Sequence, residues 1–370
     1  MQTFLELLQK EDLDGIKEFF KTHDLNLADR NTPLHYAAMG SNENNNKHRI
    51  FELLVSLGAD VNYQNNYTPL IYLCGSHLSK QAISFLLEYG TYINLQNGNT
   101  ALHYACFKKL PLEVIQMLLD FGADPTIQNN RLPQELTTNK EVKSFLECYT
   151  TLNQDLKALF ERQEFCDLDI KAKNGECKAH SLIMKLRLGD LLEKALKIFQ
   201  KEPLEHVKIY INFLYSGIIS PDGYVAVDQI STEIGIPKFH TFCGRNGILK
   251  DLEKLFLDQE SKDFEIIFNQ ESIKVHKLIL ISRSDLFRGM FLSVKDDSNK
   301  VQDYSRKSIS TIRHLIRFFY LDDFDSNLPV QVIKEMEDVV DYYQLNKNTS
   351  LKYQIELQQN RSKKDKCFIF

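Results

Sequence analysis

A short motif that recurs at nearly constant spacing constrains this chain more than any other feature. The segment TPLHYAA begins at Thr32, and related segments begin at Thr68 (TPLIYLC) and Thr100 (TALHYAC), 36 and then 32 residues later. Two further markers repeat in phase with it: a glycine, at Gly58, Gly90 and Gly122, and a Gln-Asn pair, at 64–65, 96–97 and 128–129. A period of this length predicts stacked helical units.

Each unit is predicted to fold as helix, turn, helix and loop. The threonine hydroxyl is suited to cap the first helix, and proline is suited to the first helical position because its missing N–H costs nothing there. The second helices carry apolar residues on one face, such as Ile50, Leu53, Leu54 and Leu57, and the glycines that follow are suited to left-handed C-terminal caps. An earlier, degenerate unit is indicated by Ile16, Phe19 and Phe20.

The period near 33 and the motif T-P-L-H-x-A resemble the ankyrin repeat. The resemblance implies a solenoid of about four to five units over residues 1–150, closed by a polar-faced helix at 140–149. One unit departs from the pattern, because the polar, asparagine-rich stretch 41–47 stands between its two helices. We expect this stretch to be an exposed loop.

Aromatic residues and histidines also follow the repeat. Taken alone, His35 and His103 would be candidates for catalysis or metal binding, but inside a repeat we expect them to bond neighbouring backbone and threonine groups. Packing between stacked units is expected for Tyr36, Tyr72 and Tyr104. Repeat arrays present an extended binding surface. Members of the ankyrin family often contact partners through the positions held here by Met39, Tyr63, Tyr67, Phe107 and Lys108.

A second pattern appears twice after residue 150. It consists of an aspartate, a short alternating strand, a turn, a second strand, a histidine and an apolar helix. The first copy runs from Asp167 to His180, and the second copy runs from Asp263 to His276. Both copies continue into an apolar helix followed by an acidic, helix-compatible stretch.

The second copy resembles the BTB/POZ domain, through Asp263, Val275-His276-Lys277 and the run SDLFRGMF at 284–291. The first copy keeps Asp167, Ala179-His180 and FLYSG at 213–217, but LGDL at 188–191 replaces the F-R-x-M-F run. The chain is thus similar to the ankyrin-repeat and BTB/POZ domain-containing proteins. The expected fold is mainly α with α+β modules: the N-terminal solenoid, a divergent and abbreviated BTB/POZ domain at 160–245, a second one at 258–347, and a basic tail at 348–370.

The resemblance implies that the chain binds proteins and acts as a scaffold. BTB domains pair, here within the chain or as a homodimer, and the family aspartate near the first strand, Asp167 or Asp263, usually lines the pairing face. Many members bind cullin 3, which implies docking at Phe291, Val294 and Asp296. The leading expectation is a substrate adaptor of a cullin 3 type ubiquitin ligase. The alternative is an assembly or tethering protein unconnected with ubiquitin, since Asp296 stands where the family has glutamate.

No set of residues in the sequence indicates an enzyme, a cofactor or a metal. Cys177 with His180, and His240 with Cys243, supply too few ligands for zinc, and GRNG at 244–247 lacks the lysine and hydroxyl of a phosphate-binding loop. The acidic run Asp322, Asp323 and Asp325 lacks the glycine and glutamate of a calcium loop. We expect that run to be a solvated turn and the chain to have no catalytic residues.

Charge and cysteine content bear on location and partners. A net charge of −5 argues against nucleic-acid binding, and no apolar window is long enough to span a membrane. Seven cysteines without a CxxC pair, and a first segment without a basic region, predict a cytoplasmic protein. The ending CFIF resembles a prenylation signal on Cys367, and the basic residues before it favour the cytosolic face of membranes.

Overall fold

The computed structural model describes most of the chain, with short gaps. The described residues are 2–25, 31–40, 47–63, 65–76, 80–95, 98–149, 151–236, 243–268, 271–293, 299–302, 307–324, 328–343, 345, 351–352, 355–356 and 358–359. They fall into two compact units. The first unit combines residues 1–143 with 218–244, and the second combines 144–217 with 245–370.

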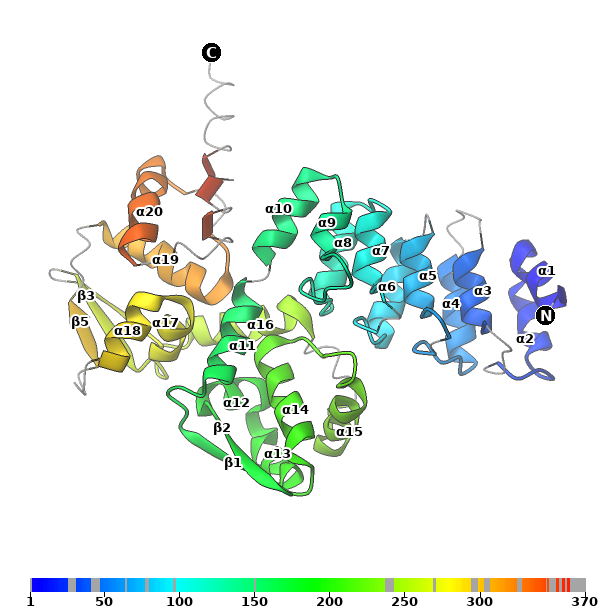
Figure 1. The fold of residues 1–370 in the computed structure, drawn as a ribbon, viewed down its shortest axis with the longest axis horizontal. Helices are drawn as coiled ribbons and strands as arrows, with labels where there is room; N and C mark the ends of the chain where they lie inside the picture. Colours follow the sequence, from blue (N-terminus) through cyan, green and yellow to red (C-terminus); the bar gives the residue numbers. More distant parts are fainter. Residues whose placement is uncertain are drawn as a thin grey trace, which may run out of the picture. The chain divides into compact units, whose positions relative to one another are not determined.

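The first unit is built mainly from pairs of short helices. In chain order these are α1 (Gln2–Lys10), α2 (Leu13–Phe19), α3 (Pro33–Met39), α4 (Lys47–Ser56), α5 (Pro69–Gly75), α6 (Lys80–Tyr89), α7 (Ala101–Phe107), α8 (Leu112–Asp120) and α9 (Pro133–Leu136). Figure 1 shows them side by side in a row. Helix α10 (Lys140–Tyr149) follows at the predicted position of the closing helix.

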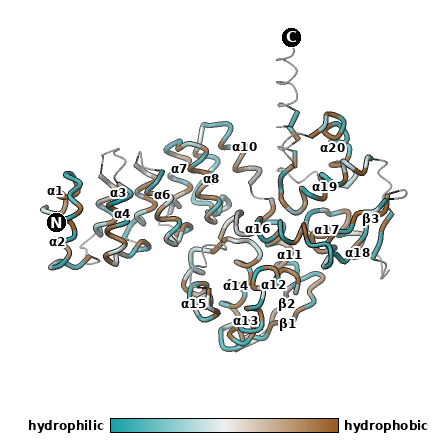
Figure 2. The backbone as a smooth tube through the Cα atoms, turned by 180° about the vertical axis from the view of Figure 1, so that it is seen from behind, coloured by the Kyte–Doolittle hydropathy of each residue, from teal (hydrophilic) through white to brown (hydrophobic). Residues whose placement is uncertain are grey.

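The apolar faces of these helices form a continuous core along the row. Alternating brown and teal along the helices in Figure 2 reflects this amphipathic pattern. Ile16, in the predicted early unit, is fully buried. The capping glycines Gly58, Gly90 and Gly122 adopt φ angles of 102°, 103° and 94°, which confirms their left-handed conformation. Residues 41–46, expected to form an exposed loop, lie outside the described residues.

A distant segment completes the first unit. Residues 218–244, which contain α15 (Tyr224–Ile234), group with the repeats, although the sequence pattern placed them in the first BTB/POZ domain at 160–245. At its end Gly244 has a φ of 65°, and an added Cβ there would lie 2.1 Å from the backbone oxygen of Asp120. A side chain cannot fit at this approach, so glycine is required.

The second unit contains two halves, and its first half comprises residues 144–217. After α11 (Thr151–Arg162), strands β1 (Leu168–Ala172) and β2 (Gly175–Ala179) form an antiparallel hairpin. Helices α12 (Ser181–Leu188), α13 (Leu192–Phe199) and α14 (Leu204–Ser216) follow, with a short 3-10 helix between the first two.

The second half comprises residues 245–359. Helix α16 (Gly244–Leu257) leads into the antiparallel strands β3 (Phe264–Phe268) and β4 (Glu271–Val275), and β5 (Lys300–Gln302) joins β3 in parallel. Helices α17 (Lys277–Arg283) and α18 (Asp285–Ser293) precede β5, and α19 (Ile309–Leu321) and α20 (Val330–Tyr342) follow it. Among the described residues, no helix is both long and apolar enough to cross a membrane.

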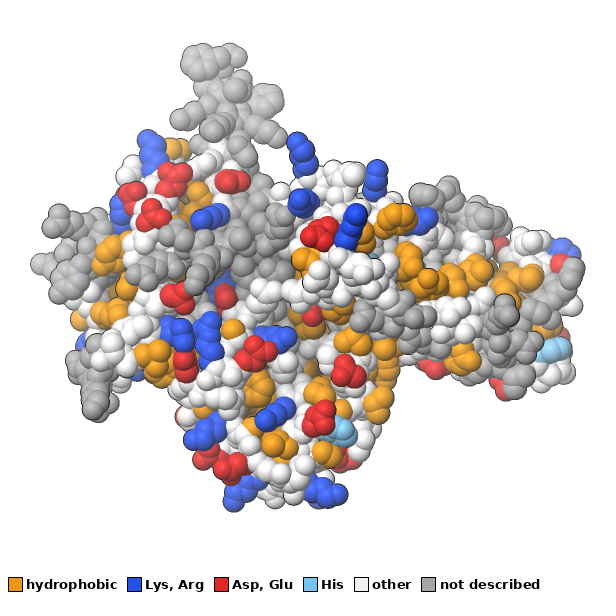
Figure 3. Space-filling view, in the orientation of Figure 1, with side chains coloured by type: hydrophobic (Ala, Val, Ile, Leu, Met, Phe, Trp, Pro, Cys, Tyr) orange, Lys and Arg blue, Asp and Glu red, His pale blue; other side chains and the backbone are white. Residues whose placement is uncertain are grey.

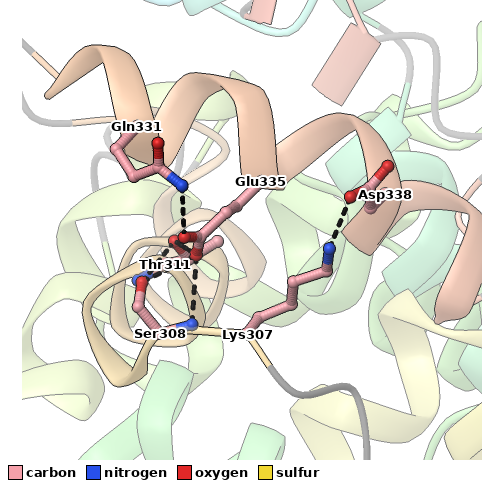
Figure 4. A network of polar contacts seen from close by, with 6 residues as sticks. All are labelled: Lys307, Ser308, Thr311, Gln331, Glu335 and Asp338. Atoms are coloured by element: carbon pink, nitrogen blue, oxygen red, sulfur yellow. Dashed lines mark hydrogen bonds and ion pairs between the residues drawn. The ribbon is translucent and has the colours of Figure 1, made fainter.

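A polar network attaches α20 to the start of α19 (Figure 4). The carboxylate of Glu335 accepts hydrogen bonds from the hydroxyl of Thr311 at 2.7 Å and from the hydroxyl and backbone N–H of Ser308 at 2.8 and 3.0 Å. Gln331 donates to it as well, and Lys307 pairs with Asp338 beside it. The bonds from Thr311, Gln331 and Ser308 lower the pKa of Glu335 to about 2. The network links α20 to the N-terminal end of α19.

Candidate protein-interaction surfaces

Threonine and histidine of the repeated motif cap the first helix of a unit. The Thr32 backbone N–H donates to Nδ1 of His35 at 3.1 Å, and the Thr32 hydroxyl lies 2.7 Å from the same nitrogen. Thr100 and His103 repeat this arrangement at 3.3 and 2.8 Å. Nε2 of His35 then lies 2.8 Å from the carbonyl oxygen of Tyr67 in the next unit. These contacts confirm the structural role predicted for both histidines, and burial lowers the pKa of each.

The tyrosines at the repeat spacing pack between units. The ring of His35 lies 5.6 Å from Tyr72 of the following unit, and the ring of Tyr67 lies 5.6 Å from Tyr104 of the unit after that, each in an edge-to-face arrangement. Such pairs contribute about 0.5 to 1.5 kcal/mol beyond the area they bury. The prediction of inter-unit packing is confirmed for Tyr72 and Tyr104.

Three of the five predicted ankyrin contact residues lie at the surface. Met39 is 45% exposed, Phe107 is 60% exposed, and the exposed Lys108 places its Nζ 5.9 Å from the centre of the Phe107 ring. Tyr63 and Tyr67 are half-buried, and Tyr67 belongs to the aromatic packing. Figure 3 shows hydrophobic side chains along the row of repeat helices. Contact between these five residues and a partner stays a prediction.

Segment 218–244 is joined to the repeats by a buried polar contact that the sequence did not indicate. The backbone N–H of Asn94 donates to the hydroxyl of Tyr224 at 2.8 Å, and its side-chain amide donates to the carbonyl of Ile219 at 3.0 Å. The ring of Tyr92 stacks on Tyr224 at 4.3 Å. Asn62 occupies the position of Asn94 one unit earlier, where it accepts from the Tyr92 N–H at 2.6 Å. The recurrence of asparagine at positions 62 and 94 is visible in the sequence, but no pattern in the sequence pointed to Tyr224 as its partner.

In the BTB-like second half, His276 connects the start of α17 to α19. Its backbone N–H donates to the hydroxyl of Tyr320 at 2.8 Å, its Nδ1 lies 2.7 Å from the same oxygen, and its Nε2 lies 2.9 Å from the hydroxyl of Ser261. His276 is fully buried, and burial lowers its pKa to about 4. The imidazole is neutral at pH 7 and connects α17 to α19 through its hydrogen bonds.

The first half repeats these contacts. The His180 backbone N–H donates to the hydroxyl of Tyr215 at 2.7 Å, and Nδ1 of His180 lies 2.8 Å from that oxygen. Its Nε2 lies 2.7 Å from the carbonyl oxygen of Glu164, and burial lowers the pKa of His180. Equivalent histidine and tyrosine positions therefore organise both halves.

The two aspartates predicted to line the pairing face each make local hydrogen bonds. Asp167 accepts from the backbone N–H and hydroxyl of Ser181 at 2.6 and 2.5 Å, and Asp263 accepts from the backbone N–H of Lys277 at 2.8 Å. Ser181 and Lys277 begin α12 and α17, so each carboxylate supplies an acceptor to a helix N-terminus. Both aspartates are exposed, and both line a cavity of about 560 Å³ between the halves. A direct role in pairing stays a prediction.

Of the predicted cullin-docking residues, only Phe291 is described. Its half-buried ring lies on α18, 5.0 Å from the ring of Phe264, with Nζ of Lys277 at 4.4 Å. Val294 and Asp296 lie outside the described residues, as does Cys367 of the predicted prenylation signal. These assignments stay predictions.

The expectation that Asp322 lies in a solvated turn is wrong. Its side chain is fully buried, and its Oδ1 accepts a hydrogen bond from Nη2 of Arg283 at 2.5 Å. Asp323 beside it is exposed, as expected for a turn. The run of acidic residues predicted exposure to solvent. Asp322 is buried because its carboxylate pairs with a buried guanidinium.

The described residues hold no group of three or more histidine, cysteine, aspartate or glutamate side chains placed to bind a metal ion. Burial raises the pKa of Cys74 and Cys106 to about 12, which keeps both thiols protonated. Nε2 of His180 lies 3.9 Å from the sulfur of Cys166, and burial raises the pKa of that thiol too. None of these three thiols has the lowered pKa of a cysteine nucleophile.

Comparison with known families identifies two modules. Residues 41–129 match the ankyrin-repeat family, described as ankyrin repeats in three copies, and residues 252–360 match the BTB/POZ domain. Neither match covers residues 160–217. No curated protein matches the chain. The chain therefore combines ankyrin repeats with a BTB/POZ domain, and both are protein-interaction modules that are typically non-catalytic.

Proposed function

We propose that the chain is a substrate adaptor of a cullin 3 type ubiquitin ligase. The observation that carries the proposal is the presence, in one chain, of an ankyrin array and a BTB/POZ domain. In this arrangement the array holds the target through Met39, Tyr63, Tyr67, Phe107 and Lys108. The BTB/POZ domain docks the cullin through Phe291, Val294 and Asp296.

We also propose that residues 160–217 are a divergent BTB/POZ half. Three features support this: a hairpin followed by a helix, an aspartate that caps that helix, and a buried histidine bound to a tyrosine. Each feature has its counterpart in the matched domain, at Asp263, His276 and Tyr320. The half lacks the F-R-x-M-F run, so the cullin site is assigned to the second half alone.

Binding to purified cullin 3 tests the adaptor function. Val294→Asp and Asp296→Lys should each weaken capture, because the first places a charge in an apolar contact and the second reverses the only acid of the site. Asp285→Lys on α18 provides a control with the same charge change. Equal capture by all three variants and the natural chain would contradict the assigned docking site.

The second candidate is an assembly or tethering protein that binds no cullin. The observation that favours it is Asp296, which is one carbon shorter than the glutamate typical of cullin-binding members. Prenylation at Cys367, a separate proposal, would place such a tether at the cytosolic face of membranes. An intact protein that retains no cullin at micromolar concentration would favour this candidate.

A further inference from the structure

Helix α16 contacts both halves of the second unit. Near its C-terminal end, the ring of Phe256 lies 5.3 Å from Tyr320 of the second half. Toward its N-terminal end, Asp251 Oδ2 lies 2.6 Å from Nη1 of Arg187 in the first half, and the same nitrogen donates to the carbonyl of Gly247 at 3.0 Å. The helix that leads into the second half is therefore bound to the first.

Helix α11, which leads into the first half, makes the reciprocal contacts. The ring of Phe160 lies 5.2 Å from Tyr215 of its own half, and Asp155 Oδ2 lies 2.7 Å from Nη1 of Arg283 in the second half. Just beyond α11, Glu164 receives two bonds of 2.7 Å from Arg288 of the second half. Hydrogen bonding to Arg288 lowers the pKa of Glu164, so the carboxylate is charged at pH 7.

Equivalent residues in the two sets of contacts are separated by the same number of sequence positions. Asp155 and Asp251 lie 96 positions apart, and so do Arg187 and Arg283. Each aspartate binds the arginine of the opposite half, which is the reciprocal pattern of a two-fold interface between identical surfaces. The cavity between the halves has the same symmetry, because His180 and His276 both line it.

The burial of both arginine side chains makes these contacts costly to break. The side chain of Arg187 is 2% exposed and that of Arg283 is 0% exposed. A buried guanidinium that loses its carboxylate carries a large desolvation cost. The leading helix of each half therefore supplies a carboxylate to the buried arginine of the other half, and Arg283 is also paired with Asp322 of its own half.

We infer that the pairing partner of the BTB/POZ domain is the first half of the same chain, so that the protein is an internally paired monomer that needs no second copy. This inference deepens the proposed function. If the two halves pair within one chain, a single copy with its ankyrin array can act as the adaptor. It rests on the proposal that residues 160–217 are a BTB-like half.

Charge exchange at Glu164 and Arg288 tests the inference in the full chain. Their side chains are 25% and 27% exposed, so reversing either charge should leave the protein folded. Glu164→Arg and Arg288→Glu should each lower the melting temperature by about 2 to 4 °C, and the double exchange in one chain should restore most of the loss. Arg313→Glu, at an exposed ion pair inside the second half, serves as the control and should have little effect.

Light scattering decides between pairing within and between chains. The natural chain should have the mass of one copy, 43.1 kDa, at micromolar concentrations. A mixture of the two single variants should show neither recovery nor a two-chain mass. A two-chain mass for the natural protein, or recovery only on mixing, would overturn the inference. Both measurements omit cullin, so failure here leaves the adaptor function standing, and absent cullin binding leaves the internal pairing standing.

Discussion

Oδ1 of Asp322 accepts a 2.5 Å hydrogen bond from Nη2 of Arg283, and both side chains are fully excluded from solvent. Asp322 follows α19 with a left-handed φ of 53°, a conformation that is uncommon for residues other than glycine but that aspartate adopts more readily than most. Gly217 occupies the corresponding position after α14, with a φ of 66°. The second half therefore has a carboxylate that pairs with the buried arginine at the position where the first half has glycine.

Replacing Asp322 should be strongly destabilising. Asp322→Ala leaves Arg283 with Asp155 as its remaining carboxylate partner among the described contacts, and breaking a buried ion pair costs about 3 to 5 kcal/mol. Chemical denaturation of the full chain measures the loss in free energy of unfolding. The exposed neighbour offers a matched control, since Asp323→Ala should change stability by less than about 0.5 kcal/mol. Equal stability of the two variants would contradict the assigned importance of the buried pair.

The tyrosine hydroxyls that hold the two histidines should matter in both halves. Tyr320→Phe and Tyr215→Phe remove the acceptor of a buried backbone N–H, and an unsatisfied buried group costs about 1 to 3 kcal/mol. Thermal melting monitored by circular dichroism checks this. Tyr342→Phe, at a tyrosine that is 40% exposed, should be close to neutral.

The neutral state of His276 predicts a pH dependence. Its pKa is about 4 in the folded chain and 6.5 as the ordinary value. Between these pH values the unfolded chain binds a proton that the folded chain lacks, so acidification from pH 6.5 to about 4 favours unfolding. His276→Gln should show a shallower loss of stability over this window. Identical slopes for the variant and the natural chain would mean that His276 does not titrate as described.

Tyr224 should hold segment 218–244 on the repeats. Tyr224→Phe leaves the buried N–H of Asn94 without its 2.8 Å acceptor, which should cost about 1 to 3 kcal/mol. Hydrogen exchange should then speed up both in α15 and around Asn94. Tyr89→Phe, at a residue that is 54% exposed, is the control. Faster exchange in α15 alone would show that the two segments are not coupled.

The repeated patterns predicted much of the fold because repetition marks the same local structure several times. The regularly spaced threonines and glycines predicted where the helices of the array begin and end. The repeated spacing between aspartate and histidine predicted both hairpins. Contacts between distant segments had no such local signal. Tyr224 contacts Asn94 only because the chain returns to the array 130 residues later, and a single sequence contains no periodicity that indicates this return.

The acidic residues show the same limit. Asp322 and Asp323 look alike in the sequence, yet one is buried on Arg283 and the other is exposed. Asp322 is buried because it pairs with Arg283, which lies 39 positions earlier in the sequence. The 96-residue shift relating Asp155 with Asp251 and Arg187 with Arg283 was present in the sequence, and an alignment of the two copies extended to their leading helices would have found it.

The proposed adaptor function requires this chain to join a target to cullin 3 through its BTB/POZ domain. Titration of the purified full chain with purified cullin 3, by calorimetry and light scattering together, tests it most directly. The account predicts saturable binding at micromolar or lower concentration, with a mass of one chain plus one cullin. No binding heat at micromolar concentration, together with separate masses for the two proteins, would contradict it.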